Sequence, residues 1–242
     1  MENRVYKADS EIPIFEKQIE ELSPIVIIDI GSGTADYLLK SAKSNPEKEY
    51  LAIDSDYNSK NNLKRTDNVH YIAADGNYLP LRNFCSDLTT TFGCYSDGHR
   101  MLEELYRITK ENKTGIIGPL NEKMGIIPSN PLDRKKLKEL ANQAIRVGGE
   151  PGERHWQLIW PPTSKFMNTY KKIREMIDTP MEDILFMYGL KVIEKELYGT
   201  SWQNKEPTYH YMWRKSIQKN ERPKPIVRTD LFGYLVDQLK QV

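Results

Sequence analysis

The residues best suited to chemistry begin at a glycine turn. The segment Asp29-Ile30-Gly31-Ser32-Gly33 directly follows a β-branched run at 25–28, and a helical pattern starts within a few residues of it. Glycines at a strand-to-helix turn let a ligand approach the main chain, and the first N–H groups of the helix can bind that ligand. Tight turns also use glycine, so this motif alone is a weak indication of a binding site.

Two further carboxylates close the next apolar runs. Asp54 ends the run 50–54, and Asp75 ends the run 69–75. An acid at the first place can accept hydrogen bonds from both hydroxyls of a ribose, and one at the second can accept from an exocyclic amine such as adenine N6. Each aspartate alone is also typical of a helix cap or a turn. Together with Asp29, these residues make three acids at the carboxyl ends of neighbouring strands. Such a set predicts that this edge of the sheet binds a ligand.

The residue after the turn argues against a dinucleotide. A dinucleotide-binding loop has a third glycine or alanine three residues after the second glycine, where the helix passes close to a pyrophosphate. Here that position is Asp36, whose negative charge would face both phosphates. The sequence therefore disfavours NAD and FAD and predicts a ligand without phosphates.

Strand-like runs alternate with helical patterns over the first half of the chain, which predicts βαβ units and a parallel sheet. Two later strands are separated by a loop too short for a crossover helix, so they must be antiparallel. The predicted fold is α/β: a Rossmann-like, doubly wound, mostly parallel seven-stranded sheet with an antiparallel last strand and a helical insertion. The expected strands are 25–30, 50–54, 69–75, 88–92, 114–118, 191–198 and 208–214, and the expected helices include 11–22, 97–110, 132–146 and 181–188.

The chain is expected to form a single domain over residues 1–242 with three additions. An N-terminal helix lies within residues 1–24, and a C-terminal extension covers residues 220–242. Residues 120–179 interrupt the alternation between the fifth strand and the next helix. We interpret this insertion as a lid over the site of a second substrate.

Composition limits the partners only weakly. The net charge of +1 over 242 residues gives no global field toward nucleic acid or an anionic membrane. The two cysteines, Cys85 and Cys94, have no metal-ligand spacing, and no metal site is expected. The sequence has no apolar run of the kind found in signal peptides or membrane-spanning helices, so a cytoplasmic protein is expected.

Residues 25–118 resemble the cofactor half of the class I S-adenosylmethionine-dependent methyltransferases. The resemblance is carried by DIGSGTADYLL, AIDSD, AADG and TTTFGCYSDG, and the antiparallel last strand is typical of that family. It implies methyltransferase activity with S-adenosylmethionine as cofactor. The implied contacts are Asp29, Gly31, Ser32 and Gly33 in the loop, Asp54 and Ser55 at the ribose, Asp75 and Gly76 at the adenine, and Phe92 and Gly93 at the methionine and methyl group. The sequence departs from the family at Ala35, where many members have a third glycine.

The residues that would contact a methyl acceptor are less clear, and no general base is assigned. Asp97 is also suited to cap the following helix, and His99 lies in its first turn. Aromatic residues of the insertion could form a small core instead of a substrate site. The weak catalytic candidates are Tyr95, Asp97 and His99, and the candidate acceptor-binding residues are Tyr95, His155, Trp156 and Trp160.

Three functions remain open. A small-molecule acceptor is favoured, because the net charge is near zero and no appended RNA-binding module is evident. An rRNA or tRNA methyltransferase is the alternative, because residues 205–228 contain seven basic side chains interleaved with Tyr209, Tyr211 and Trp213, which could stack on bases. Helix 132–146 adds further basic residues to this alternative. The third function is an inactive scaffold that only binds S-adenosylmethionine. The oligomeric state is not predicted.

Overall fold

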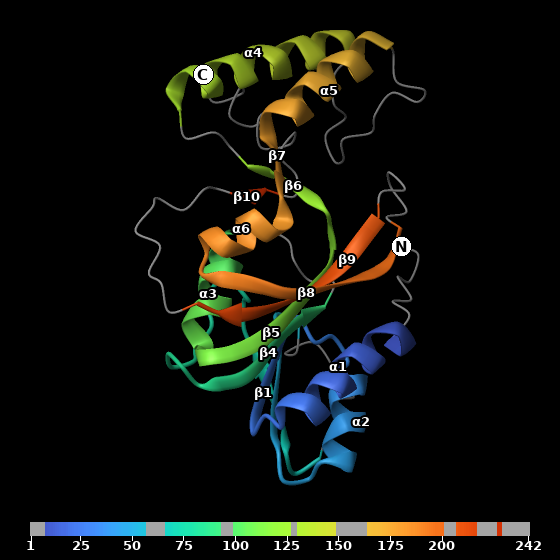
Figure 1. Cartoon of the computed structure of the whole chain (residues 1–242), viewed down its shortest axis with the longest axis vertical. Coiled ribbons are helices and arrows are strands. Elements are labelled where there is room, and N and C mark those ends of the chain that lie inside the picture. The colour runs from blue at the N-terminus through green and yellow to red at the C-terminus, as the bar shows by residue number, and fades with distance from the viewer. Residues whose placement is uncertain are drawn as a thin grey trace. The chain divides into compact units, whose positions relative to one another are not determined.

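The structure is a computed structural model of the chain, and it describes residues 8–56, 66–92, 99–126, 130–148, 164–200, 207–216 and 227–228. The chain divides into two compact units, which are described separately (Figure 1). The first unit contains Met1–Tyr95, Arg100–Glu122 and Leu185–Glu221, and the second contains Ser96–His99, Lys123–Ile184 and Arg222–Val242.

The first unit is built on a seven-stranded sheet with the order β3-β2-β1-β4-β5-β9-β8. Its strands are β1 (Val26–Ile30), β2 (Glu49–Asp54), β3 (Val69–Ala73), β4 (Ser86–Phe92), β5 (Thr109–Asn121), β8 (Leu190–Thr200) and β9 (Pro207–Lys215). The strands from β3 to β5 pair in parallel, whereas β9 is antiparallel to both of its neighbours, β5 and β8. The predicted Rossmann-like sheet with an antiparallel last strand is confirmed.

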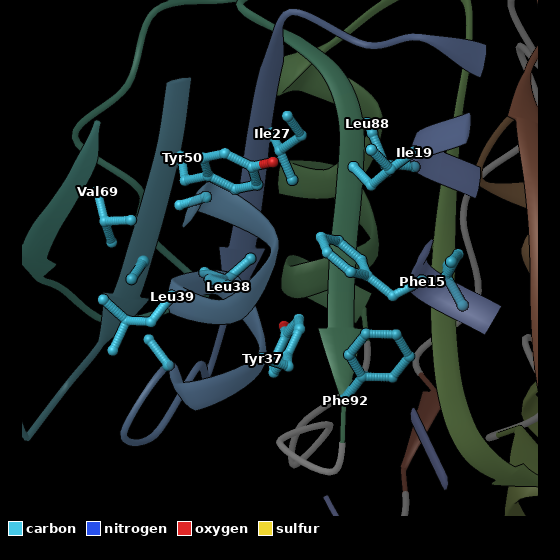
Figure 2. Packing of buried hydrophobic residues seen from close by; sticks show 14 of the residues in the cluster. Phe15, Ile19, Ile27, Tyr37, Leu38, Leu39, Tyr50, Val69, Leu88 and Phe92 are labelled. Atoms are coloured by element: carbon cyan, nitrogen blue, oxygen red, sulfur yellow. The ribbon is translucent and has the colours of Figure 1, made fainter. Parts of the chain in front are cut away.

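Helices cover both faces of this sheet. α1 (Ala8–Leu22) and α2 (Asp36–Ser44) contribute to one apolar cluster with Tyr50 and Leu88 of the sheet (Figure 2). α3 (His99–Ile108) lies on the other face, where its Met101 approaches Thr91. All seven residues of β4 are buried, as expected for a central strand that is covered on both sides.

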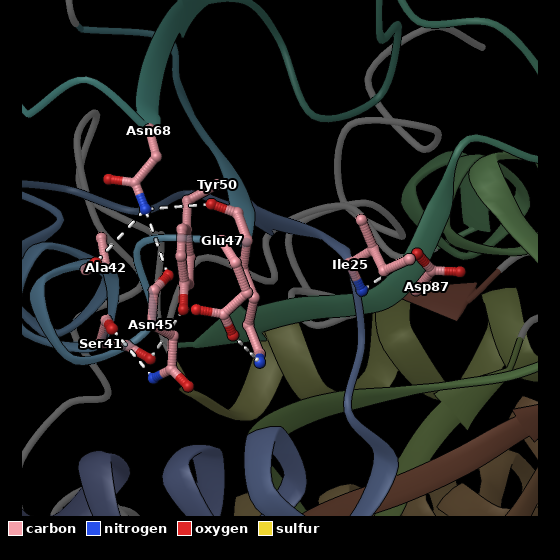
Figure 3. A network of polar contacts seen from close by, with 9 residues as sticks. Ile25, Ser41, Ala42, Asn45, Glu47, Tyr50, Asn68 and Asp87 are labelled. Carbon is pink, nitrogen blue, oxygen red and sulfur yellow. Dashed lines mark hydrogen bonds and ion pairs between the residues drawn. The ribbon is translucent and has the colours of Figure 1, made fainter.

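The amino ends of the parallel strands are joined by polar contacts (Figure 3). Asp87 Oδ2 accepts from the main-chain N–H of Ile25 (3.3 Å) and of Val26 (3.0 Å), and its Oδ1 accepts from Lys110 Nζ (2.9 Å). Burial alone would raise the pKa of Asp87, but the Val26 N–H and the Lys110 ammonium outweigh it and hold the pKa below its ordinary value. Nearby, the Asn68 amide donates to the Lys48 carbonyl at 3.0 Å. These contacts fix the edge opposite the predicted ligand-binding edge.

The fifth strand is longer than its sequence pattern indicates. The apolar pattern predicts a strand over 114–118, whereas β5 spans Thr109–Asn121. Its polar start pairs with β4 and its end pairs with β9, with register shifts in both ladders. The main-chain hydrogen bonds of two neighbours therefore extend the strand beyond its apolar centre.

The second unit contains a three-stranded antiparallel sheet and two long helices. The sheet has the order β10-β6-β7. The elements are β6 (Lys123–Ile126), β7 (Asp178–Pro180), β10 (Val227–Arg228), α4 (Pro131–Gly148) and α5 (Ser164–Ile177), with α6 (Met181–Met187) crossing the boundary between the units. The helix predicted over 132–146 corresponds to α4. Within the described part of the chain, no helix is long and apolar enough to span a membrane.

Gly115 in β5 has no room for a side chain. A Cβ at this position would overlap the Thr89 carbonyl and the buried Trp213 indole, with only 2.6 Å to its Cε2 atom. We expect Gly115→Ala to lower the free energy of unfolding by about 3 kcal/mol, because strand and ring would both have to shift. Urea denaturation measures this loss. Gly33→Ala is the reference for backbone strain without overlap, since its Cβ would meet no atom within 4 Å but its φ of 57° costs an alanine about 1–2 kcal/mol; a loss at Gly115 no larger than this would contradict the packing argument.

Candidate functional site

The carboxyl ends of β1 and β2 are held together by the loop that follows β1. Gly31 N donates to the Ile53 carbonyl at 2.7 Å, and Ser32 donates to the same oxygen through both its N–H and its hydroxyl, each at 3.1 Å. The φ angles of Gly31 (74°) and Gly33 (57°) lie in the left-handed region that favours glycine. A Cβ at Gly33 would have no atom within 4 Å, so the main chain there can be approached.

Asp29 lies beneath this loop in β1. Its side chain is buried, with 1% of its surface exposed, and Oδ1 accepts a hydrogen bond from Thr90 Oγ1 of β4 at 2.8 Å. Asp29 stands opposite Ala52 on one side and Thr90 on the other. The predicted loop acid is therefore a buried link between two strands.

Asp54 links the loop to the end of β2. Its Oδ2 accepts from Gly33 N at 2.9 Å, and its Oδ1 accepts from Asp56 N at 2.9 Å. A carboxylate offers about four lone-pair sites, so it can hold the loop and also accept from the adjacent hydroxyls of a ribose. Ser55 is exposed beside it.

Asp75 and Gly76 follow β3. Asp75 is exposed, and its Oδ1 accepts from the main-chain N–H (2.8 Å) and the side-chain amide (3.1 Å) of Asn77. A Cβ at Gly76 would lie 2.8 Å from Ile30 Cγ2 and 2.9 Å from Met101 Cε. Only glycine lets the chain after β3 pass this close to the end of β1. The structure thus brings Asp29, Asp54 and Asp75 to the carboxyl ends of three neighbouring strands.

The departure at Ala35 has a conformational consequence. Ala35 is buried and has a φ of 57°, in the left-handed region, directly before α2. A glycine would adopt this conformation without strain. The alanine adopts the same conformation at a cost of about 1–2 kcal/mol. Its N–H donates to the Ser32 carbonyl at 2.8 Å, which holds the turn closed.

Phe92 closes β4 and is surrounded by rings. Its ring packs edge-on against Tyr37 (5.7 Å between centroids) and against His210 of β9 (5.5 Å). Several predicted site residues lie outside the described part of the chain, and for His99 only the main chain is described, at the start of α3. The predicted residues outside the description are Gly93, Tyr95, Asp97, His155, Trp156 and Trp160.

His210 is a buried residue beside the candidate site residue Phe92, and the sequence analysis did not single it out. It is 2% exposed, and its ring packs against Phe92 and against Tyr198 (4.7 Å). In the described part of the chain its Nε2 has no hydrogen-bond partner. Burial lowers the pKa of His210 to about 4, so the imidazole is neutral at pH 7. The alternation of Tyr209, Tyr211 and Trp213 indicates only one buried face, whereas β9 is an inner strand with both faces covered.

The proposed stacking of bases on β9 is wrong for two of its three aromatic residues. Tyr211 and Trp213 are fully buried, with 0% of their surfaces exposed, so neither can stack on a nucleic acid. Lys215, one of the seven basic residues, is also buried: its ammonium donates to the Thr109 carbonyl at 2.7 Å. Its neighbour Arg214 is exposed.

The sequence matches no protein-family model and no curated protein. Solved structures do match. A methyltransferase from Methanosarcina mazei, described as S-adenosylmethionine-dependent, is 10% identical, and the alignment covers 85% of this chain and 98% of that one with a TM-score of 0.50. The chain has the class I methyltransferase fold.

Other proteins with the methyltransferase fold align less well. Human N-acetylserotonin methyltransferase, crystallised with S-adenosylmethionine, is 11% identical with a TM-score of 0.47; the alignment covers 88% of this chain and 53% of the human one, so this chain spans about half its length. A 16S rRNA adenine methyltransferase from Catenulisporales acidiphilia is 12% identical with a TM-score of 0.44, covering 86% and 92%.

The buried neutral His210 predicts a loss of stability in acid. In the unfolded chain His210 has its ordinary pKa of about 6.5 and binds a proton below that pH. In the folded chain its pKa is about 4, so it binds the proton only near pH 4. The free energy of unfolding should therefore fall by up to about 3 kcal/mol as the pH falls from 6.5 to 4. Urea denaturation of the wild type and of His210→Asn at several pH values measures this contribution as the difference between the two curves.

The control for this measurement is His70→Asn. His70 is exposed and lies 2.8 Å from Glu49 Oε2. An acid dependence that is the same in His210→Asn as in the wild type would show that His210 is not buried as a neutral imidazole.

Proposed function

We propose that the protein is an S-adenosylmethionine-dependent methyltransferase whose cofactor lies at the carboxyl ends of β1, β2 and β3. The proposal depends on the position of Asp54 at the end of β2. Its carboxylate accepts the hydrogen bond of the Gly33 N–H, and the space around Gly33 is open to a ligand. This is the place in an open α/β sheet where an acid accepts the hydroxyls of a ribose. The methyltransferase fold is consistent with it.

The charges of the site suit an adenosine ligand that has no phosphates. Asp54 and Asp75 can accept hydrogen bonds but cannot donate them when ionised, and both lie at the same edge. Asp36 is exposed in the first turn of α2, where its charge would oppose a pyrophosphate. Hydroxyls, an exocyclic amine and a positive sulfonium group are the partners that such a set favours.

Each residue would act by binding and orientation. When bound, S-adenosylmethionine supplies a methyl group activated by its sulfonium sulfur. Asp54 would hold the ribose, Asp75 would hold the adenine amine, and the end of β4 would contact the methionine part. Phe92 would form an apolar wall there and exclude water. Holding the acceptor in line at near-attack distance is the main contribution that a protein makes to such a displacement.

Among the described residues, the end of β4 is surrounded by aromatic rings. The rings of Phe92, Tyr198 and the neutral His210 lie together beyond the end of β4. The net charge of the whole chain favours a small molecule as the acceptor, whereas the distribution of charge between the two units favours RNA. A scaffold that only binds the cofactor would form no S-adenosylhomocysteine with any acceptor.

The proposal predicts that Asp54 is needed for cofactor affinity. Asp54→Asn keeps one oxygen for the Gly33 N–H but removes the charge and one acceptor, so S-adenosylhomocysteine should bind about tenfold or more weakly. Isothermal titration calorimetry measures the change. Asp56→Asn is the matched control, because Asp56 is an exposed acid two residues away.

The control should bind as the wild type does, and both variants should unfold at similar urea concentrations. If the wild type gave no heat with S-adenosylmethionine or S-adenosylhomocysteine, or if Asp54→Asn bound as tightly as the wild type, the proposed cofactor site would be wrong.

A further inference from the structure

The net charge of the whole chain is close to zero, but the two units differ in net charge. The first unit contains twenty lysines and arginines against twenty-three acids, a net charge of −3. The second contains fifteen against eleven, a net charge of +4. The argument from net charge against a polyanionic partner therefore does not apply to the second unit.

The positive charge of the second unit is concentrated on its two long helices. α4 contains five basic residues and two acids, and α5 contains four basic residues and one acid. The pair thus carries a net charge of +6, and Figure 1 shows the two helices side by side. The rest of the second unit is slightly negative. The helix pair, rather than the whole unit, is the basic surface.

The basic side chains lie on the outside of this pair. One face of each helix packs into a shared apolar core. The buried members of this core are Leu137, Ala141 and Ala144 of α4 and Ile173 and Ile177 of α5. The lysines lie away from those positions, and four of them are exposed in adjacent couples. These are Lys135, Lys136, Lys171 and Lys172. Arg174 is held by Asp178 at 2.7 Å, but among the described residues no acid forms an ion pair with these four lysines.

We propose that the outer face of α4 and α5 binds the phosphate backbone of an RNA, and that this RNA is the methyl acceptor. The binding part of the proposal depends only on the helix pair, whereas the acceptor part rests on the proposed methyltransferase function. α4 is about 27 Å long, so its side chains can reach several successive phosphates. Each lysine that meets a phosphate releases condensed counterions, which is a favourable and strongly salt-dependent contribution.

A membrane surface is a weaker explanation of the same charges. A helix that lies in a membrane interface buries an apolar face in the lipid. Here most of the described apolar residues of α4 and α5 pack against each other, and the exposed large apolar side chains described on the pair are Leu132 and Met167. The basic residues are also distributed along both helices, as expected for an extended polyanion.

RNA fits the proposed chemistry better than duplex DNA does. A methyltransferase must bring its target base out of the stack, and in a duplex this costs a few kcal/mol. Loops and bulges of RNA present unstacked bases without that cost, and proteins recognise them through aromatic surroundings.

The test is the binding of a fluorescein-labelled RNA stem–loop to the full-length protein, measured by fluorescence anisotropy between about 50 and 200 mM salt. The test variant changes Lys135, Lys136, Lys171 and Lys172 to Gln. The matched control changes Lys40, Lys43, Lys191 and Arg82 to Gln, which removes the same charge from exposed positions of the first unit. Duplex DNA of the same length and phosphatidylserine vesicles are tested in parallel.

We expect the test variant to bind the RNA at least tenfold more weakly than the wild type and to show a shallower salt dependence, while the control binds as the wild type does. An equal loss in both variants, no RNA binding by the wild type, or binding of the DNA or the vesicles at least as tight as that of the RNA would overturn the proposal. S-adenosylhomocysteine calorimetry on all three proteins reads the cofactor site independently, so a failure of the proposed function is distinguished from a failure of RNA binding.

Discussion

The hydrogen bond from Gly33 N to the Asp54 carboxylate joins the ends of two neighbouring strands, and the proposed site depends on it. Together with the bonds from Gly31 and Ser32 to the Ile53 carbonyl, it fixes the path of the chain between β1 and α2. The same contact places an acid beside an open stretch of main chain. A loop fixed in this way needs little further ordering when a ligand arrives, which favours affinity.

Much of the fold could be predicted from the sequence because its signals are local. The β-branched run before Gly31 is typical of a parallel strand that is buried on both faces, and Asp54 and Asp75 follow directly from the positions of the next two apolar runs in the sequence. The short connection before β9 was enough to predict its antiparallel direction. The positions of Asp29, Asp54 and Asp75 at one edge followed from the same reasoning, since parallel strands share an edge.

Other features depend on contacts between distant segments, and the sequence pattern could not reveal them. The polar start of β5 is a strand only because β4 supplies hydrogen bonds. His210 is buried because β8 covers the far side of β9 and places Tyr198 against the imidazole. The sequence also could not reveal the difference in net charge between the two units, because the net charge of the whole chain does not show which residues belong to which unit. The acceptor-side residues from 93 to 98 and those of the insertion from 149 to 163 lie outside the described part of the chain and stay predictions.

The position of β9 between β5 and β8 has a consequence for the synthesis of the protein. β9 is the last strand of the large sheet to leave the ribosome, yet it fills an inner place in that sheet. Before β9 is synthesised, one side of β5 lacks its main-chain hydrogen-bond partners. During that time β8 lacks its neighbouring strand in the sheet. Unpaired strand edges of this kind promote aggregation, and pairing between distant segments is slow. A nascent chain that stalls before residue 207 therefore holds the cofactor half of the sheet in an incomplete and vulnerable state.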